Sequence, residues 1–310
     1  MLDATHDFLN TIRSAGIEPP DHITPGKFHR FPGAGKSKSN QAAWCLLFED
    51  GMAGSYGDWS TGLSENWHFK QNKPFSASEH SKYQKRIKAA QKNETAKKVN
   101  GHANAAICAS DIWKKSTIAK PCHPYLRRKG IQTHGAKALD DSLVLPIISF
   151  EGTLTSLQYI APNGAKKLLW RGKKQGCFIP IDYYSAPTDI LNAADKTRNQ
   201  QLPFRVIITE GWATACSLAE TESTSVVVAA IDAGNLKSVA MSTRKHWPDA
   251  EIIIASDDDR QTAGNPGLTK AKAAAQAANA LIWQPIWPDN APEILTDFND
   301  LHTWIKGELS

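Results

Sequence analysis

The pattern of apolar and polar positions changes near residue 204. From there on, short apolar runs alternate with segments whose spacing predicts helices at 212–221, near 236–245 and at 268–280. The apolar runs are RVIIT (205–209), SVVVAAI (225–231), EIIIAS (251–256) and ALIWQPI (280–286). Continuous apolar strands separated by helices are typical of a parallel sheet that helices cover on both faces. We therefore expect an α/β domain over residues 201–310.

A different pattern occupies residues 121–200. The segments LVLPIISFEG, LTSLQYIAPNG, KKLLWRG and GCFIPI are apolar runs that end at Gly or Asn-Gly. Such runs predict antiparallel strands joined by tight turns. HPYLRRKGI, which precedes them, indicates a helix end followed by a turn, and residues 185–201 have the composition of a connector. We expect a mixed α/β subdomain here.

The first 76 residues predict a small β-rich module. A short helix is expected over residues 1–15, and Pro19 and Pro20 end it. Many aromatics and glycines follow over residues 26–70, in short apolar runs between turns. Four tryptophans could stack on nucleobases, although core packing is the simpler explanation: Trp44, Trp59, Trp67 and Trp113.

Residues 77–120 are expected to form a basic helical linker. The segment 77–117 is rich in Lys, Ala and Gln, has no proline and contains a single glycine, Gly101. This composition predicts one or two surface helices.

The net charge of +5 hides an uneven distribution. Residues 70–130 carry 15 Lys and Arg against 3 Asp and Glu, a net charge of +12, whereas residues 201–310 carry 8 against 14, a net charge of −6. A basic segment joined to an acidic one suggests a polyanionic partner beside a metal site. A solvated basic helix without a specific partner explains the charge equally well.

Cysteine usage and hydropathy argue against a disulfide-bonded, zinc-binding, membrane-spanning or secreted protein. The five cysteines are scattered singly without a CxxC pair, so neither a disulfide framework nor a zinc ribbon is expected. No apolar run approaches the roughly 18 residues of a membrane span. The N-terminus lacks a basic start followed by an apolar run, so no signal peptide is expected. We expect a reduced, cytoplasmic protein without zinc and without a membrane partner.

Carboxylates follow the predicted parallel strands. Glu210 follows RVIIT, Asp232 follows the apolar run of SVVVAAI, and Asp257, Asp258 and Asp259 follow EIIIAS. Because functional groups gather at the carboxyl ends of such strands, these side chains can converge on one rim. Clustered carboxylates repel one another unless a cation is present, and hard oxygen ligands favour Mg²⁺ or Mn²⁺. With an extended backbone Asp257 and Asp259 would point the same way and Asp258 elsewhere; alternatively, the triplet only forms a turn that caps the next helix.

These motifs together resemble the Toprim domain. VIITEGWATACSL followed by IIIASDDDR is similar to its Glu-Gly after one strand and DxD after a later one, and the resemblance covers about residues 204–305. VVVAAIDAGNL, NPGLTKAKAAAQA and DFNDL resemble the primases of conjugative plasmids and satellite phages. The segment from HPYLRRKGI to KKLLWRG resembles the basic half of the bacterial primase core, and the N-terminal module resembles the leader of mobile-element primases.

The resemblance implies a DNA primase that makes short RNA primers on single-stranded DNA from NTPs, by nucleotidyl transfer with Mg²⁺ or Mn²⁺. It implies Glu210, Asp257 and Asp259 as the catalytic metal ligands. Asp297 and Asp300 would be outer ligands, unless they only cap the helix before LHTWI. The cations that would contact triphosphate or template, each of which could also be an ordinary surface charge, are Arg127, Arg128, Lys129, Lys166, Lys167 and Arg171.

Two features depart from the replicative primases. No zinc ribbon precedes the basic half, and GAGKS at 33–37 lacks a complete P-loop because Arg30 stands where a glycine is needed, so a Gly-rich turn is the better interpretation. The chain would therefore be a fragment, or would work with a replicative helicase in trans. A Toprim nuclease and a non-catalytic single-stranded-DNA-binding accessory module stay open as alternatives.

Overall fold

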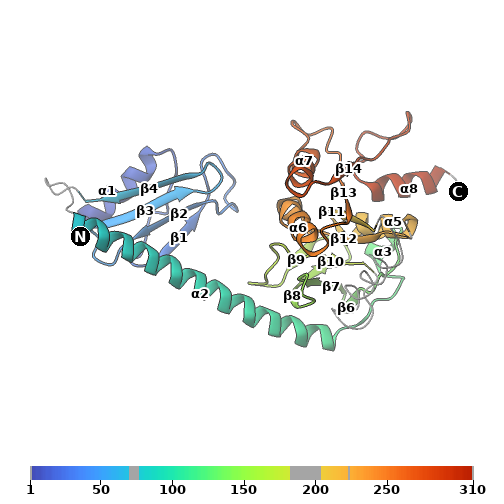
Figure 1. Ribbon diagram of the computed structural model, residues 1–310, viewed down its shortest axis with the longest axis horizontal. Helices are drawn as coiled ribbons and strands as arrows, with labels where there is room; N and C mark the ends of the chain where they lie inside the picture. Colours follow the sequence, from blue (N-terminus) through green and yellow to red (C-terminus); the bar gives the residue numbers. More distant parts are fainter. Residues whose placement is uncertain (1, 70–76, 182–203, 223, 309–310) are drawn as a thin grey trace. The chain divides into compact units, whose positions relative to one another are not determined.

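The computed structural model describes residues 2–69, 77–181, 204–222 and 224–308. The chain divides into two compact units, Met1–Lys88 and Ala89–Ser310, and each is described by itself (Figure 1). Within the described ranges, none of the helices has the length and apolar character needed to cross a membrane.

The first unit is a four-stranded antiparallel sheet with one helix. Its elements, in chain order, are α1 (Leu2–Ser14), β1 (Phe28–Phe31), β2 (Ala43–Leu47), β3 (Ala53–Asp58) and β4 (Leu63–His68). The strands pair in the order β1-β2-β3-β4. Phe8 and Ile12 of α1 are fully buried and belong to the same hydrophobic core as Cys45, Leu47 and Tyr56 of the sheet. The predicted N-terminal helix and β-rich module are thereby confirmed.

The tryptophans divide between core and surface. Trp67 is 6% exposed and Trp113 is 8% exposed, as core packing requires. Trp59 is 55% exposed, and it stacks with Trp44 outside the core that α1 covers. Core packing is therefore wrong for Trp59, because the strand alternation places its stacking partner Trp44 on the face opposite Cys45.

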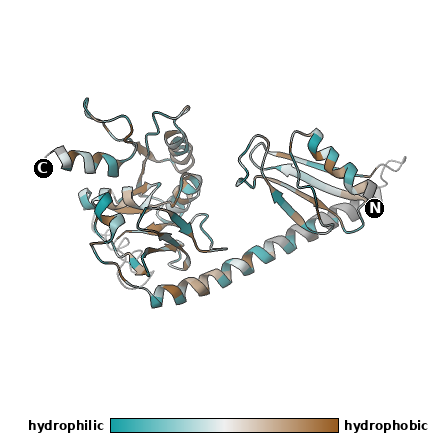
Figure 2. Cartoon of the chain, turned by 180° about the vertical axis from the view of Figure 1, so that it is seen from behind, coloured by the Kyte–Doolittle hydropathy of each residue, from teal (hydrophilic) through white to brown (hydrophobic). Residues whose placement is uncertain are grey.

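A single helix, α2 (Ala77–Lys115), accounts for the predicted one or two surface helices. Figure 2 shows apolar segments near its C-terminal end, where Ala105, Ala109 and Trp113 are buried. Near its C-terminal end, Ala109 and Trp113 pack against Val144 and Leu157, which anchors the helix to the second unit. Residues 95–100 are exposed, so the burial that the described part of the helix shows lies toward its C-terminal end.

The second unit begins with an antiparallel sheet. Its strands pair in the order β5-β6-β7-β8-β9. The elements are β5 (Thr117–Ile118), α3 (Pro124–Lys129), β6 (Lys137–Leu139), β7 (Ser142–Ile148), β8 (Leu154–Ile160) and β9 (Lys166–Leu168). Helix α3 ends at Gly130, whose φ of 61° is the left-handed cap that glycine favours. These elements confirm the predicted helix end, turn and strands.

A second, mostly parallel sheet follows. Its strand order is β10-β12-β11-β13-β14, and only β10, at one edge, is antiparallel. The strands are β10 (Ile179–Pro180), β11 (Arg205–Thr209), β12 (Val226–Ala229), β13 (Glu251–Ala255) and β14 (Leu281–Trp283). GCFIPI thus contributes its strand β10 to this sheet and not to the preceding one, with only an isolated bridge from Phe178 to Ile148 of β7.

Helices cover both faces of this sheet (Figure 1). The helices are α5 (Trp212–Thr221), α6 (Ala233–His246), α7 (Pro266–Ala278) and α8 (Phe298–Glu308). Ile207 packs on the face of α5, whereas Val206 and Ile208 belong to the core on the side of α6 and α7. The expected parallel sheet with helices on both faces is confirmed.

The two sheets of the second unit share hydrophobic packing. Leu145 and Ile147 of β7 belong to the same buried cluster as Ile207 of β11 and Trp212 of α5. The connector expected at 185–201 lies outside the described residues. The subdivision into 1–76, 77–120, 121–200 and 201–310 stays a prediction.

Candidate functional site

Strand register brings the candidate carboxylates to one edge of the parallel sheet. Thr209, the last residue of β11, lies opposite Ala229 of β12 and Ala255 of β13. Glu210 therefore follows the central strand, between the segments that continue β12 and β13. Gly211 then caps α5, so the chain turns sharply into the helix and leaves the Glu210 side chain at the rim.

A strained turn places the neighbouring carboxylate. Ile231 has a φ of 80°, a left-handed conformation that is costly for a β-branched residue. The next residue, Asp232, is the N-cap residue of α6. The backbone amide of Ala233, the first residue of this helix, donates a hydrogen bond to Glu210.

The three aspartates of the triplet have different partners. Asp258 accepts hydrogen bonds from Trp287 Nε1 at 2.8 Å and from Asn265 Nδ2 at 2.8 Å, so its carboxylate is fully engaged in holding the loop. Asp259 Oδ2 accepts from the backbone amide of Gly267 at 2.9 Å, at the start of α7. The carboxylate of Asp259 raises the pKa of both Glu210 and Asp257. The capping interpretation of the triplet is therefore present at Asp259, and its metal-ligand interpretation stays a prediction.

Asp257 is strongly perturbed by its surroundings. Burial, as the largest cause, and the nearby carboxylates of Asp297, Glu210 and Asp259 together raise its pKa to about 8, against an opposing effect of Lys166. Its Oδ1 atom is buried without a hydrogen-bond partner. A buried oxygen that no donor satisfies is costly, and a bound cation is one way to satisfy it.

Glu210 is perturbed for related reasons. Burial raises its pKa, the carboxylates of Asp232 and Asp259 raise it as well, and the amide of Ala233 and the ammonium of Lys166 lower it. The pKa values of Glu210 and Asp257 both respond to Asp259 and to Lys166. We therefore call Glu210, Asp257 and Asp259 the acidic rim.

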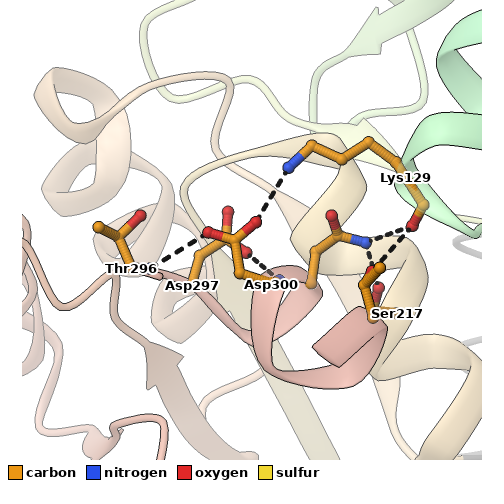
Figure 3. Close-up of polar contacts among 7 residues, drawn as sticks. Lys129, Ser217, Thr296, Asp297 and Asp300 are labelled. Carbon is orange, nitrogen blue, oxygen red and sulfur yellow. Dashed lines mark hydrogen bonds and ion pairs between the residues drawn. The ribbon is translucent and has the colours of Figure 1, made fainter. Parts of the chain in front are cut away.

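Asp297 and Asp300 lie at the start of α8 (Figure 3). Asp297 Oδ1 accepts from the backbone amide of Asp300 at 2.9 Å, and Asp300 Oδ2 accepts from the backbone amide of Thr296 at 3.1 Å. The capping role weighed for this pair is therefore present. Burial raises the pKa of Asp297, with a further rise from Asp300, and Asp297 in turn acts on Asp257, so it also belongs to the electrostatic environment of the rim.

Lysines from the basic half that precedes the parallel sheet reach these carboxylates. Lys166 Nζ lies 3.9 Å from the position that a Cβ atom at Gly211 would take, and it acts on both Glu210 and Asp257. Lys174 forms an ion pair with Asp232. Lys129 Nζ lies 3.3 Å from Asp300 Oδ1, as Figure 3 shows.

The other candidate cations have different surroundings. Arg128 donates to the carbonyl of Pro162 and lies over the Tyr125 ring. The Arg171 side chain lies against Gly101 of α2. Arg127 and Lys167 are exposed on α3 and β9. Of the six predicted cations, the structure thus groups Lys166 and Lys129 with the acidic residues and places the other four elsewhere on the basic half.

The acidic rim fits a hard divalent cation by its chemistry. Its donors are carboxylate oxygens, one of them buried without a partner, and such donors suit Mg²⁺ or Mn²⁺. The carboxylates of the rim do not converge on a single position in this structure, since no three His, Cys, Asp or Glu side chains among the described residues are arranged to hold an ion. Mutual repulsion and the ammonium of Lys166 are consistent with this open arrangement.

Gly267 is a structural requirement of the rim. A Cβ atom there would lie 2.9 Å from the carbonyl oxygen of Asp257 and 3.0 Å from Asp259 Oδ2. Gly267→Ala is expected to lower the free energy of unfolding by about 1–3 kcal/mol, because backbone and carboxylate must shift to admit the methyl group. Thermal unfolding measures this effect.

Gly307→Ala is the matched control, because an added Cβ there meets no atom within 4 Å. Equal stability of the two alanine variants would contradict the close packing described for Gly267.

Sequence reasoning missed several residues that build the site. Lys174, which pairs with Asp232, comes from a Gly- and Lys-rich turn without a distinctive motif. Asn299 is fully buried and donates to the Lys129 carbonyl at 2.7 Å and to Ser217 Oγ at 2.9 Å, which ties α8 to α3 and α5. Its place in DFNDL, two residues after Asp297, was the only sequence signal for it.

Comparison with known proteins agrees with this geometry. Residues 205–304 match the Toprim domain family. Two proteins from Escherichia coli named DNA primase TraC are each 32% identical to the chain, over 98% and 90% of its length. The chain spans only 21% and 25% of those two proteins.

Solved structures show a weaker likeness. The primase fragment of the bacteriophage T7 primase-helicase protein superimposes on 91% of this chain and 97% of its own length, with a TM-score of 0.42 and 13% identity. So low a TM-score does not establish a shared fold. The Toprim resemblance read from the sequence is nevertheless confirmed by the family match: residues 205–304 are a Toprim domain, in a chain related over nearly its whole length to DNA primases named TraC.

Proposed function

We propose that the chain is a DNA primase, which makes short RNA primers on single-stranded DNA. The observation that carries this proposal is the acidic rim at the carboxyl edge of a Toprim sheet, in a chain related over 98% of its length to a DNA primase. We also propose a cytoplasmic protein of a mobile genetic element, of the conjugative-plasmid or satellite-phage type, that works with a replicative helicase in trans or as part of a longer chain.

Glu210, Asp257 and Asp259 would hold Mg²⁺ or Mn²⁺, with Asp297 and Asp300 as outer groups. When bound, the cation would activate the attacking 3′-hydroxyl and neutralise charge on the leaving pyrophosphate. Alternatively, Glu210 would accept the proton of that hydroxyl, because a carboxylate whose pKa is raised above its usual value is a stronger base.

Lys166 would orient the triphosphate. Its ammonium lies close to the rim carboxylates of Glu210 and Asp257. When a metal–nucleotide complex binds there, the ammonium could exchange its contact with a carboxylate for one with a phosphate. Lys167 and Arg171 on the same hairpin, and Arg127, Arg128 and Lys129 on and after α3, would add contacts to nucleotide or template. The +12 charge of residues 70–130 supports general affinity for a polyanion.

The double variant Lys166→Ala/Lys167→Ala is expected to raise the KM for NTP, or to lower kcat, by about tenfold or more, because charge-assisted phosphate contacts are lost. Steady-state primer synthesis at varied NTP concentration measures this. Mn²⁺ binding by the acidic rim should stay nearly unchanged, since the carboxylates are retained.

Lys270→Ala/Lys272→Ala removes the same charge from exposed positions of α7 and is the matched control. If both double variants behave like the wild type at limiting NTP, Lys166 and Lys167 are ordinary surface cations and triphosphate recognition lies elsewhere.

One assay separates the proposal from its alternatives. The chain is incubated with single-stranded DNA, labelled NTPs and Mg²⁺ or Mn²⁺, and the products are resolved by length. Dinucleotides or longer RNA support a primase. Nicked or shortened DNA would indicate a Toprim nuclease, and binding without products would indicate an accessory module.

A further inference from the structure

The N-terminal module carries an exposed aromatic cluster that the acidic rim does not explain. Phe28, Trp44 and Trp59 lie with nearly parallel rings, with centroids 5.4 Å, 5.9 Å and 6.1 Å apart in the three pairs. The guanidinium of Arg30 lies 4.5 Å from the Trp59 ring centre. We call these four residues the aromatic shelf, and we propose that it binds single-stranded nucleic acid by stacking on unpaired bases.

The shelf lies on the sheet face that α1 does not cover. Arg30 pairs directly with Trp44, so the two side chains project from the same face, while the neighbouring Phe31 and Cys45 belong to the core under α1. Trp59 follows β3 and is held by a backbone hydrogen bond to Ala42 at 3.0 Å. The shelf is therefore an ordered surface of the sheet and not part of the core under α1.

A glycine allows the Trp44 ring of the shelf to lie flat on the neighbouring strand. A Cβ atom at Gly57, opposite Trp44, would lie 3.0 Å from two atoms of the indole and 2.3 Å from the Leu63 carbonyl oxygen. The indole therefore lies directly over the backbone of β3. Its Nε1 atom is buried without a hydrogen-bond partner, which leaves a donor for an incoming polar group if the side chain shifts.

Cations accompany Phe28 and Trp44 along the chain. Residues 22–48 contain Lys27, Arg30, Lys36 and Lys38 but no Asp or Glu. Lys36 and Lys38 lie in the loop after β1 that contains GAGKS, and Asp58 fixes this loop by accepting from the Ala34 amide at 3.1 Å. GAGKS is thus a turn, in agreement with its interpretation as a Gly-rich turn, and Lys36 lies close enough to the Asp58 carboxylate, one residue before Trp59, to lower its pKa.

An exposed aromatic stack with cations beside it matches single-stranded nucleic acid better than duplex. Unpaired bases offer flat faces that stack on Trp and Phe, while the cations neutralise phosphates. In a duplex those faces are already stacked within the helix and are not available. The proposal concerns binding alone, so it does not depend on primer synthesis.

Fluorescence anisotropy of a labelled oligo(dT) tests the proposal on the full chain, without NTP or divalent metal. Trp59→Ala is expected to weaken binding by about 5- to 100-fold, the range that alanine substitution of a base-stacking residue produces. Trp59→Phe should restore most of the affinity. Oligo(dT) should also quench the tryptophan fluorescence of the wild type.

Met52→Ala, an exposed apolar position of the same module outside the shelf, is the matched control and should bind like the wild type. If Trp59→Ala also loses affinity for oligo(U), the result supports a shelf that binds single-stranded DNA and RNA alike. Unchanged oligo(dT) affinity of Trp59→Ala, or an equal loss on duplex DNA, would overturn the proposal. Because metal and NTP are absent, failure here leaves the primase proposal intact, and failed primer synthesis leaves this one intact.

Discussion

Glu210→Gln is expected to lower primer synthesis by about 10²-fold or more while the fold persists, because the variant loses both a ligand charge and a proton acceptor. The side chain keeps its size, and its neighbours are mostly other anions, so no favourable ion network is broken. Initial rates at saturating NTP and metal measure the effect, and circular dichroism verifies the fold.

Glu222→Gln, at the C-terminal end of α5, removes an equal charge far along the helix from the rim and should retain wild-type rates. Priming by Glu210→Gln at the rate of this control would show that the acidic rim is not the catalytic centre.

Asp257→Asn is expected to stabilise the metal-free protein by about 1–4 kcal/mol at pH 9, an order of magnitude set by roughly 1.4 kcal/mol per unit of pKa shift. The asparagine cannot ionise, so the variant avoids burying a charge among Glu210, Asp259 and Asp297. Chemical denaturation in the presence of a chelator measures the difference, and the same variant should lose primer synthesis.

The sign of the pH dependence follows from the direction of the shift. The pKa of Asp257 is raised to about 8 in the folded protein, above the value near 4 of an unfolded chain, so the folded state binds the proton more tightly. This group therefore makes the wild type less stable as pH rises from about 4 to about 8, and Asp257→Asn should remove that part of the slope. Identical pH profiles for the two proteins would contradict the burial and crowding described for Asp257.

The sequence predicted the parallel strands well, because burial on both faces alone determines their composition. Strands buried on both faces are continuous apolar runs, so β11, β12 and β13 could be recognised from RVIIT, SVVVAAI and EIIIAS, and the expected helix at 212–221 matches α5. Because parallel strands end at one edge, the convergence of Glu210 with Asp257 and Asp259 followed as well.

Other features depend on contacts between distant segments. The pairing of Lys174 with Asp232 and the transfer of β10 to the parallel sheet have no local signature. Trp59 was expected in the core because most tryptophans are, yet strand alternation and the loop fixed by Asp58 place it on the surface. Its role could be inferred only once Phe28, Trp44 and Arg30 were seen beside it.

Template-directed nucleotide incorporation is the most direct test of the central claim. The full chain is supplied with a homopolymeric single-stranded DNA template, Mg²⁺ or Mn²⁺ and one labelled NTP at a time. The account predicts short RNA products only with the complementary nucleotide, only with metal, and none from Asp257→Asn. Products that ignore the template, form in the presence of chelator or persist in Asp257→Asn would contradict it.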